Sequence, residues 1–421
     1  MNKVNIFFYY IKHYIFVVFY FINIIFSSIN IFFPLHIIKL WHKHSKINKI
    51  ISKICSVLYI FNNLFGYSLL NQTISNIFFI IYMLGVWCIE SLMCQIINIL
   101  IIKMQSFVTV LLKFAGTDIF VYQEKGKHIK ASLVKGSIVT IPNHLSELDT
   151  LYIGSLYNNY YPPIRSGKAF AKSAIRFYPF IGWLLLTSDV IFVQNRNKKS
   201  NLGQHAYIEN KLKNNGDIPS QTTIFIEGIT FNEKVRLERN LGAEQLGSPT
   251  YDNVLVPRTT GIYLTEKNID VRNEIYVSMK FTDAEGKPFD KKYYDMTIAQ
   301  LFFGGHKPHQ VHLLVRPKTY DGSDIDSREK FNNRIFQNFK SIDETLSESL
   351  DQWSEKYDRE KIGITFKDLL ITFIILLHII YSTYLLTNSL IYLMYFGMAC
   401  VAYIIMGFLE HKNVISKTKN D

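Results

Sequence analysis

The stretch SIVTIPNHLSELD, residues 137–149, decides how the middle of the chain folds. Its first five residues are mostly β-branched and apolar, so they predict a buried strand at Ser137–Ile141. Pro142 ends that strand, because proline has no backbone N–H to donate to a ladder. His144 and Asp149 follow, and they converge if the segment bends into a helix. The aspartate then accepts from one imidazole nitrogen and leaves the other free as a general base.

A lone His–Asp pair at this spacing occurs by chance in many chains, so it needs support from elsewhere in the sequence. The 421 residues suffice for one large domain or two smaller ones with a sizeable core. The net charge of +12 suits an anionic partner, either nucleic acid or an anionic bilayer. No segment resembles a nucleic-acid-binding module, so we expect a bilayer and no nucleic acid. The four cysteines lie in apolar end segments without CxxC spacing and predict neither a disulfide framework nor a zinc site.

Apolar residues crowd the two ends of the chain. Tyr14–Phe33 is about long enough to cross a bilayer and predicts a signal anchor. Ile74–Ile102 either spans the bilayer or lies at its interface. Leu369–Leu386 and Leu390–Leu409, separated by a short polar break, predict a hairpin of two spans. Lysines after the hairpin favour a cytosolic carboxyl terminus, so we expect an integral membrane protein.

Between these ends, Asp118–Tyr320 alternates candidate strands and helices, which predicts an α/β domain with a largely covered sheet. The candidate strands are Ile119–Tyr122, Ser137–Ile141, Val190–Val193, Thr223–Ile226, Ile275–Phe281 and Val311–Val315. The candidate helices are Leu148–Asn158, Ala171–Phe177 and Gly203–Asn214. From Asp324 to Trp353, apolar residues recur near helical spacing and predict an amphipathic helix.

These patterns divide the chain into four regions. Residues 1–113 form an N-terminal membrane-anchoring region and residues 114–320 the catalytic domain. Residues 321–366 form an amphipathic helical extension, and residues 367–421 a transmembrane hairpin with a basic tail.

Three further stretches place charged residues near strand ends. Lys172 opens a basic amphipathic segment that leads into a strand followed by Arg196. Glu227 directly follows another apolar strand, and VPRTTG at residues 256–261 ends an apolar run with Arg258, which is suited to a phosphate. Residues at the carboxyl ends of strands in a doubly wound α/β domain meet in one crevice. The sequence therefore predicts that these charges gather around the His–Asp pair.

The ordered set Asn-His-x4-Asp, Lys…Pro-x-x-Gly, Phe-x-Glu-Gly and Val-Pro-Arg-Thr-Thr-Gly resembles the glycerolipid acyltransferase family, the lysophosphatidic acid acyltransferases and their relatives. The resemblance covers about residues 100–350. The last block and the terminal apolar runs look most like the eukaryotic branch that includes lysocardiolipin and lysophosphatidylinositol acyltransferases. The resemblance implies the glycerolipid acyltransferase fold, a mixed α/β sheet flanked by helices, with transmembrane helices at both ends.

The resemblance also implies a reaction. His144 would deprotonate a hydroxyl of a lysophospholipid, which attacks the thioester of acyl-CoA, and Asp149 would fix the imidazole tautomer and stabilise the imidazolium. Acyl-CoA would be a co-substrate, with no cofactor or metal required. The residues that would bind the substrates are Asn143, Lys172, Arg196, Glu227, Gly228, Pro257 and Arg258.

Two blocks depart from the family pattern. Many members read Pro-Glu-Gly-Thr-Arg in the third block, whereas this chain has Thr230 in place of the arginine. That loss removes a bidentate phosphate contact and tilts the expected acceptor away from simple lysophosphatidic acid. In the second block the family arginine would fall at Asn195, whereas the cation here is Arg196. A slip of one residue on a strand reverses the facing of the side chain.

Two alternatives stay open, a glycerol-3-phosphate-type acyltransferase and a catalytically inactive membrane scaffold. The fourth block and tail disfavour the first, and the retained His–Asp pair disfavours the second. A metal at His306, His309 and His312 is disfavoured because Pro308 and the strand after it predict a strand entrance. The expected location is the endoplasmic reticulum, with the catalytic domain facing the cytosol, and a mitochondrial membrane is the alternative.

Overall fold

A computed structural model describes part of the chain. The described residues are 105–127, 136–160, 166–177, 190–193, 201–213, 219–291 and 307–388, with single residues at 185, 294, 300, 301, 401 and 404. The predicted segments Tyr14–Phe33 and Ile74–Ile102, most of Leu390–Leu409, and the site residue Arg196 lie outside them. Among the described residues, no helix combines the length and apolar character needed to cross a membrane.

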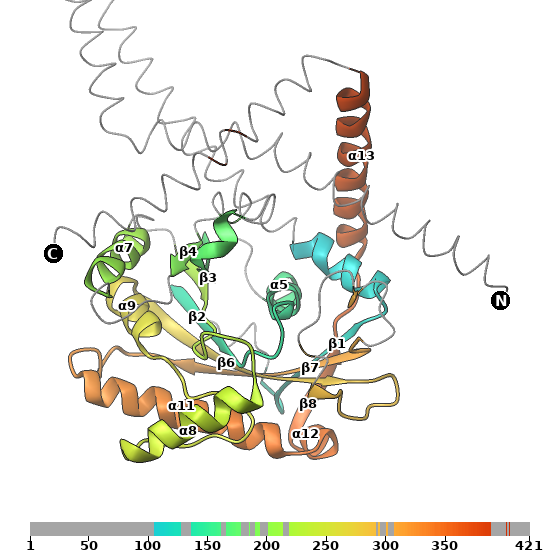
Figure 1. Ribbon diagram of the computed structural model, residues 1–421. Helices are drawn as coiled ribbons and strands as arrows, with labels where there is room; N and C mark the ends of the chain where they lie inside the picture. Colours follow the sequence, from blue (N-terminus) through green and yellow to red (C-terminus); the bar gives the residue numbers. More distant parts are fainter. Residues whose placement is uncertain are drawn as a thin grey trace, which may run out of the picture.

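The described strands form one mixed sheet. Their bounds are β1 (Asp118–Glu124), β2 (Ser137–Pro142), β3 (Ser166–Lys172), β4 (Ile191–Val193), β5 (Ser220–Thr223), β6 (Val271–Thr282), β7 (Gln310–Thr319) and β8 (Tyr357–Lys361). The strand order is β4-β3-β5-β2-β6-β7-β1-β8 (Figure 1). Only β6–β7 and β1–β8 are antiparallel among these pairs. The predicted mixed α/β sheet flanked by helices is confirmed.

Helices cover both faces of this sheet. Their bounds are α5 (Asp149–Tyr160), α7 (Asn201–Lys213), α8 (Glu233–Gln245), α9 (Thr260–Asn268), α11 (Arg328–Ser347), α12 (Leu350–Lys356) and α13 (Phe366–Asn388). Figure 1 shows α5 on one face and α8, α11 and α12 on the other. Helix α7 packs with α9 against β4. A further helix at residues 105–114 precedes β1, and α13 rises away from the sheet.

Strand β2 contributes side chains to two separate cores, because successive side chains of a strand point to opposite faces of the sheet. Ile138 lies in a buried cluster with Leu156 of α5. Val139 and Ile141 lie in the other cluster, with Phe339 of α11. Burial on both faces explains why the sequence of β2 is almost continuously apolar.

Helix α11 is fixed to the sheet by a partly buried arginine, Arg334. The guanidinium of Arg334 donates to Glu266 of α9 at 2.7 Å, to Asp324 at 2.5 Å and to Glu274 of β6. Tyr320 packs against the guanidinium, 4.4 Å from its ring centroid. Removing the arginine would leave these buried carboxylates without a cationic partner, which is strongly destabilising.

The structure corrects several predicted boundaries. The strand predicted at Thr223–Ile226 was placed too late in the sequence, because β5 ends at Thr223. The apolar residues after it lie in a buried turn. The helix predicted at Ala171–Phe177 was wrong at its start, because β3 runs to Lys172 and a 3-10 helix follows at Ser173–Phe177. The amphipathic stretch from Asp324 is two helices rather than one. A capping box at Ser349 starts the second helix.

Candidate active site

The catalytic pair predicted from spacing comes together at the carboxyl end of β2. His144 follows the strand, and Asp149 is the first residue of α5. His144 Nδ1 lies 3.0 Å from Asp149 Oδ2, which also accepts from the backbone N–H groups of Leu145 and Ser146. Burial raises the pKa of Asp149, and the hydrogen bonds from these three donors oppose that rise. The carboxylate therefore holds both the imidazole and the turn that carries it.

The imidazole is fixed on its other sides by the turn that follows β5. Phe225 stacks on the His144 ring, with centroids 4.2 Å apart and an interplanar angle of 27°. The backbone N–H of Phe231 donates to the His144 carbonyl at 2.7 Å. Within the described part of the chain, His144 Nε2 has no hydrogen-bond partner. An imidazole with Nδ1 bonded to a carboxylate and Nε2 free can accept a proton from a hydroxyl.

Glu227 braces the site through backbone N–H groups. Its Oε1 accepts from the His144 N–H at 2.7 Å and its Oε2 accepts from the Leu255 N–H at 2.8 Å. The side chain is buried, and burial raises its pKa to about 8. Glu227 thus ties the segment after β2 to the segment before α9. Its predicted contact with substrate stays a prediction.

Asn143 also contacts backbone. Its side chain donates to the Met279 carbonyl at 3.2 Å and accepts from the Met279 N–H at 2.7 Å. The residue is fully buried, so its amide extends the pairing of β2 with β6 beyond Pro142. This two-way hydrogen bond fixes where the chain leaves the sheet towards His144. Its predicted role in substrate binding is untested.

Gly228 and Arg258 meet beside Glu227. Gly228 has φ +74°, and a Cβ added there would lie 3.3 Å from the Arg258 side chain. A glycine is required because L side chains rarely adopt that φ. The Arg258 backbone N–H donates to the Ile226 carbonyl at 2.7 Å. Pro257 is buried and Arg258 is exposed, so the predicted cation lies at the surface beside Gly228.

A second arginine at this turn is Arg239 of α8, which we had not singled out from the sequence. Its Nη1 donates to the carbonyls of Glu227 at 2.8 Å and Val256 at 3.3 Å. Burial and the nearby charge of Arg258 lower the pKa of Arg239. Nothing local in the sequence marks Arg239, because its contact depends on how α8 folds back.

Lys172 lies at the end of β3 and approaches the catalytic turn. Its Nζ is 2.8 Å from Oε1 of Glu147, which lies between His144 and Asp149 in the sequence. Both side chains are about half exposed, and such pairs contribute only about 0.2–1 kcal/mol. The ammonium can therefore exchange this partner for an anionic ligand at small cost.

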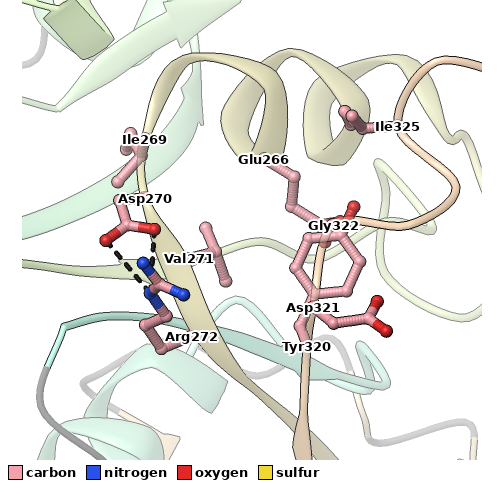
Figure 2. Close-up of a pocket in the computed structure, with 9 residues that line it drawn as sticks. All are labelled: Glu266, Ile269, Asp270, Val271, Arg272, Tyr320, Asp321, Gly322 and Ile325. Atoms are coloured by element: carbon pink, nitrogen blue, oxygen red, sulfur yellow. Dashed lines mark hydrogen bonds and ion pairs between the residues drawn. The ribbon is translucent and has the colours of Figure 1, made fainter.

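A cavity of about 100 Å³ lies away from the His–Asp pair, at the amino end of β6 (Figure 2). Its lining includes the ion pair of Arg272 with Asp270. Register places Val271 opposite Ser137 and Val277 opposite Pro142, so this cavity and His144 are at opposite ends of β2. The cavity is therefore separate from the candidate active site.

Of the histidines considered as metal ligands, His312 lies in β7. Its ring nitrogens are hydrogen-bonded to Tyr122 at 3.2 Å and Thr282 at 3.1 Å. Burial lowers its pKa to about 3, so the ring is neutral. His306 lies outside the described residues, and the described ones contain no group of three or more side chains that could hold a metal ion.

Comparison with known proteins agrees with this geometry. Residues 121–259 match the model of the acyltransferase family. Lysocardiolipin acyltransferase 1 of Gallus gallus is 30% identical over 186 residues, covering 42% of this chain and 45% of the relative. The 1-acyl-sn-glycerol-3-phosphate acyltransferase delta of Bos taurus is 24% identical over 158 residues, covering 37% and 40%. The 1-acyl-sn-glycerol-3-phosphate acyltransferase 2 of Brassica napus is 26% identical over 196 residues, covering 43% and 44%.

The fold, the His–Asp pair and the matched family model together support an acyltransferase domain in this part of the chain. The family model and these relatives support membership of the glycerolipid acyltransferase family. The matched part spans less than half the length of these relatives. No solved structure matches the chain.

The raised pKa of Glu227 predicts a pH-dependent stability. The folded state holds this proton up to about pH 8, whereas the unfolded chain releases it near 4.5. The stability from this group is therefore complete below pH 4.5 and is lost as the pH rises to about 8. We expect the Tm of the wild type, measured by intrinsic fluorescence, to fall across this range relative to that of Glu227→Gln. A Tm difference that stays constant over the range would contradict the raised pKa.

The two carbonyl contacts of Arg239 predict a structural cost for its removal. Arg239→Ala should lower the free energy of unfolding by about 1–3 kcal/mol, because one charged donor joins two loops. Glu238→Ala, at the exposed neighbouring position of α8, should change it by less than about 0.5 kcal/mol. Thermal unfolding of both variants checks the expectation. Equal stabilities for the two would show that the Arg239 contacts contribute nothing.

Proposed function

We propose that the protein moves a fatty acyl group from acyl-CoA to a free hydroxyl of a lysophospholipid at a membrane. The observation that carries this proposal is the His144–Asp149 pair, with Nδ1 held by the carboxylate and Nε2 left for a substrate. The named relatives, a lysocardiolipin acyltransferase and 1-acylglycerol-3-phosphate acyltransferases, support a lysophospholipid acceptor.

The reaction needs only proton transfer and orientation from the protein. Nε2 of His144 takes the proton of the acceptor hydroxyl as its oxygen attacks the thioester carbonyl carbon. The C–S bond then breaks, and the imidazolium returns the proton to the departing CoA thiolate. Asp149 stabilises the imidazolium between these events, since its Oδ2 already faces Nδ1. An ester and free CoA result, with no covalent bond to the protein.

Cations around the pair support anionic substrates. Arg258 is exposed beside Gly228, and Lys172 is bound to Glu147 only by an exposed ion pair. A guanidinium can bind a phosphate in bidentate fashion and an ammonium as a point charge. Because Thr230 stands where many relatives have arginine, we favour acceptors of the lysocardiolipin or lysophosphatidylinositol type.

Membrane association is the second part of the proposal. Between Leu369 and Ile380 of α13, large apolar side chains at seven positions are exposed, namely Leu369, Leu370, Phe373, Ile374, Leu376, Leu377 and Ile380. On a protein surrounded by water, an exposed apolar patch of this kind marks a site of contact with a membrane or another protein. We infer that the chain is an integral membrane protein of the endoplasmic reticulum, with the catalytic domain facing the cytosol.

An acyl-transfer assay with an acceptor panel tests the reaction. Membranes containing the protein would receive radiolabelled acyl-CoA with lysophosphatidic acid, lysophosphatidylinositol, lysocardiolipin or glycerol-3-phosphate. We expect product on one lysophospholipid, and a loss of at least about 10³-fold in His144→Ala, because the general base is removed. Product on glycerol-3-phosphate alone would reassign the acceptor. Equal signal from the wild type and a folded His144→Ala protein would support the inactive scaffold instead.

A further inference from the structure

We propose that Ser106, Asn158 and Asp368 form a polar clamp that sets the position of the catalytic pair relative to a lipid bilayer. The clamp would make these side chains positioning residues for the reaction at a membrane. This inference rests on the proposed acyl transfer to a membrane lipid. It adds a structural link between the lipid-facing helix and the helix that carries Asp149.

The clamp consists of consecutive hydrogen bonds across three helices. Ser106 Oγ, in the helix at 105–114, donates to Asn158 Oδ1 at 2.9 Å. Asn158 Nδ2, in the last turn of α5, donates to Asp368 Oδ1 at 2.9 Å. Asp368 Oδ2 accepts from the N–H and Oγ1 of Thr365 at 2.9 and 2.7 Å. Both carboxylate oxygens of Asp368, which is only 1% exposed, are therefore satisfied.

One face of α13 packs on the domain and the other is open. Asp368, Ile371 and Thr372 are buried at positions i, i+3 and i+4, which share one side of a helix. The seven exposed apolar positions named above lie on the remaining sides. Figure 1 shows α13 leaving the domain beside the helix at 105–114. The clamp therefore lies at the base of the exposed apolar surface.

A lipid bilayer is the occupant that this surface fits. The apolar run of α13 continues to Leu386 in the sequence and is followed by a second run at Leu390–Leu409, and each run is roughly as long as a bilayer span. Lys367 precedes the run, and the chain carries a net charge of +12, both suited to an anionic lipid surface. The helix at 105–114 directly follows the other apolar end of the chain.

The clamp acts on catalysis through α5, which is a rigid connection. Asp149 is the first residue of α5 and Asn158 lies in its last turn, about 14 Å away along the helix axis. A second contact, from Thr109 Oγ1 to Ser155 Oγ at 3.1 Å, holds α5 against the helix at 105–114. Movement of α13 relative to α5 would therefore shift His144 and Asp149 relative to lipid head groups.

The test compares two acceptors of the same head group. One is a long-chain lysophospholipid in vesicles of phosphatidylcholine with phosphatidylserine, and the other is its short-chain form dissolved below its critical micelle concentration. Asn158→Leu removes both amide contacts of the clamp with little change in size, and Ser106→Ala removes only one. Asn159→Leu is the matched control, because the Asn159 amide donates to the Ser155 carbonyl within α5 at 2.9 Å.

We expect Asn158→Leu to lower kcat/KM on the vesicle acceptor on the order of ten-fold, and Ser106→Ala to lower it less, since misplacement by about 1 Å costs that much or more. On the dissolved acceptor, kcat/KM of both variants should stay within about two-fold of the wild-type value. Asn159→Leu should match the wild type on both acceptors. A parallel loss on both acceptors, or no loss on either, would overturn the clamp. A wild type that acylates neither acceptor would instead overturn the proposed function, and the clamp with it.

Discussion

The side chain of Glu227 joins two segments that meet at His144. It accepts the backbone N–H of His144 on one side and that of Leu255 on the other. The Glu227 carbonyl accepts from Arg239, which also donates to the Val256 carbonyl. The side chain and backbone of Glu227 therefore link its own turn to the segments that contain His144 and Leu255. A buried polar group costs free energy unless it is hydrogen-bonded, and here both oxygens of the Glu227 side chain accept a backbone N–H. The geometry of the His–Asp pair depends on this arrangement.

The chain brings its charges to the site from separate parts of one sheet edge. His144 follows β2, Glu227 follows β5 and Lys172 ends β3, and these three strands are adjacent and parallel. Parallel strands end at the same edge, so residues far apart in sequence gather there. The buried groups hold the geometry of the site, while Lys172 and Arg258, the cations of the proposed function, are exposed. This division of roles suits the proposed acyl transfer between two phosphate-bearing molecules.

The sequence predicted the parts of this site that depend on local pattern. β2 was recognisable by its apolar run, and the His144–Asp149 contact followed from spacing plus a helix start. Contacts that depend on packing were not predictable. Arg239 reaches the site only because α8 folds back on the Glu227 turn, and β8 (YDREK) carries no strand pattern yet pairs with β1. Ile224 and Ile226 led to a wrong strand prediction because a buried turn contains apolar residues just as a buried strand does.

The most direct test of the central claim, that Asp149 acts through His144 as one general base, is a double-variant cycle. Acyl transfer to the preferred lysophospholipid would be measured for His144→Ala, Asp149→Asn and the double variant, with folding verified by Tm. If the two residues form one unit, the double variant will be no slower than His144→Ala alone, because removing the base already abolishes what the aspartate supports. Losses that multiply in the double variant, or an Asp149→Asn protein with the wild-type rate, would contradict the account.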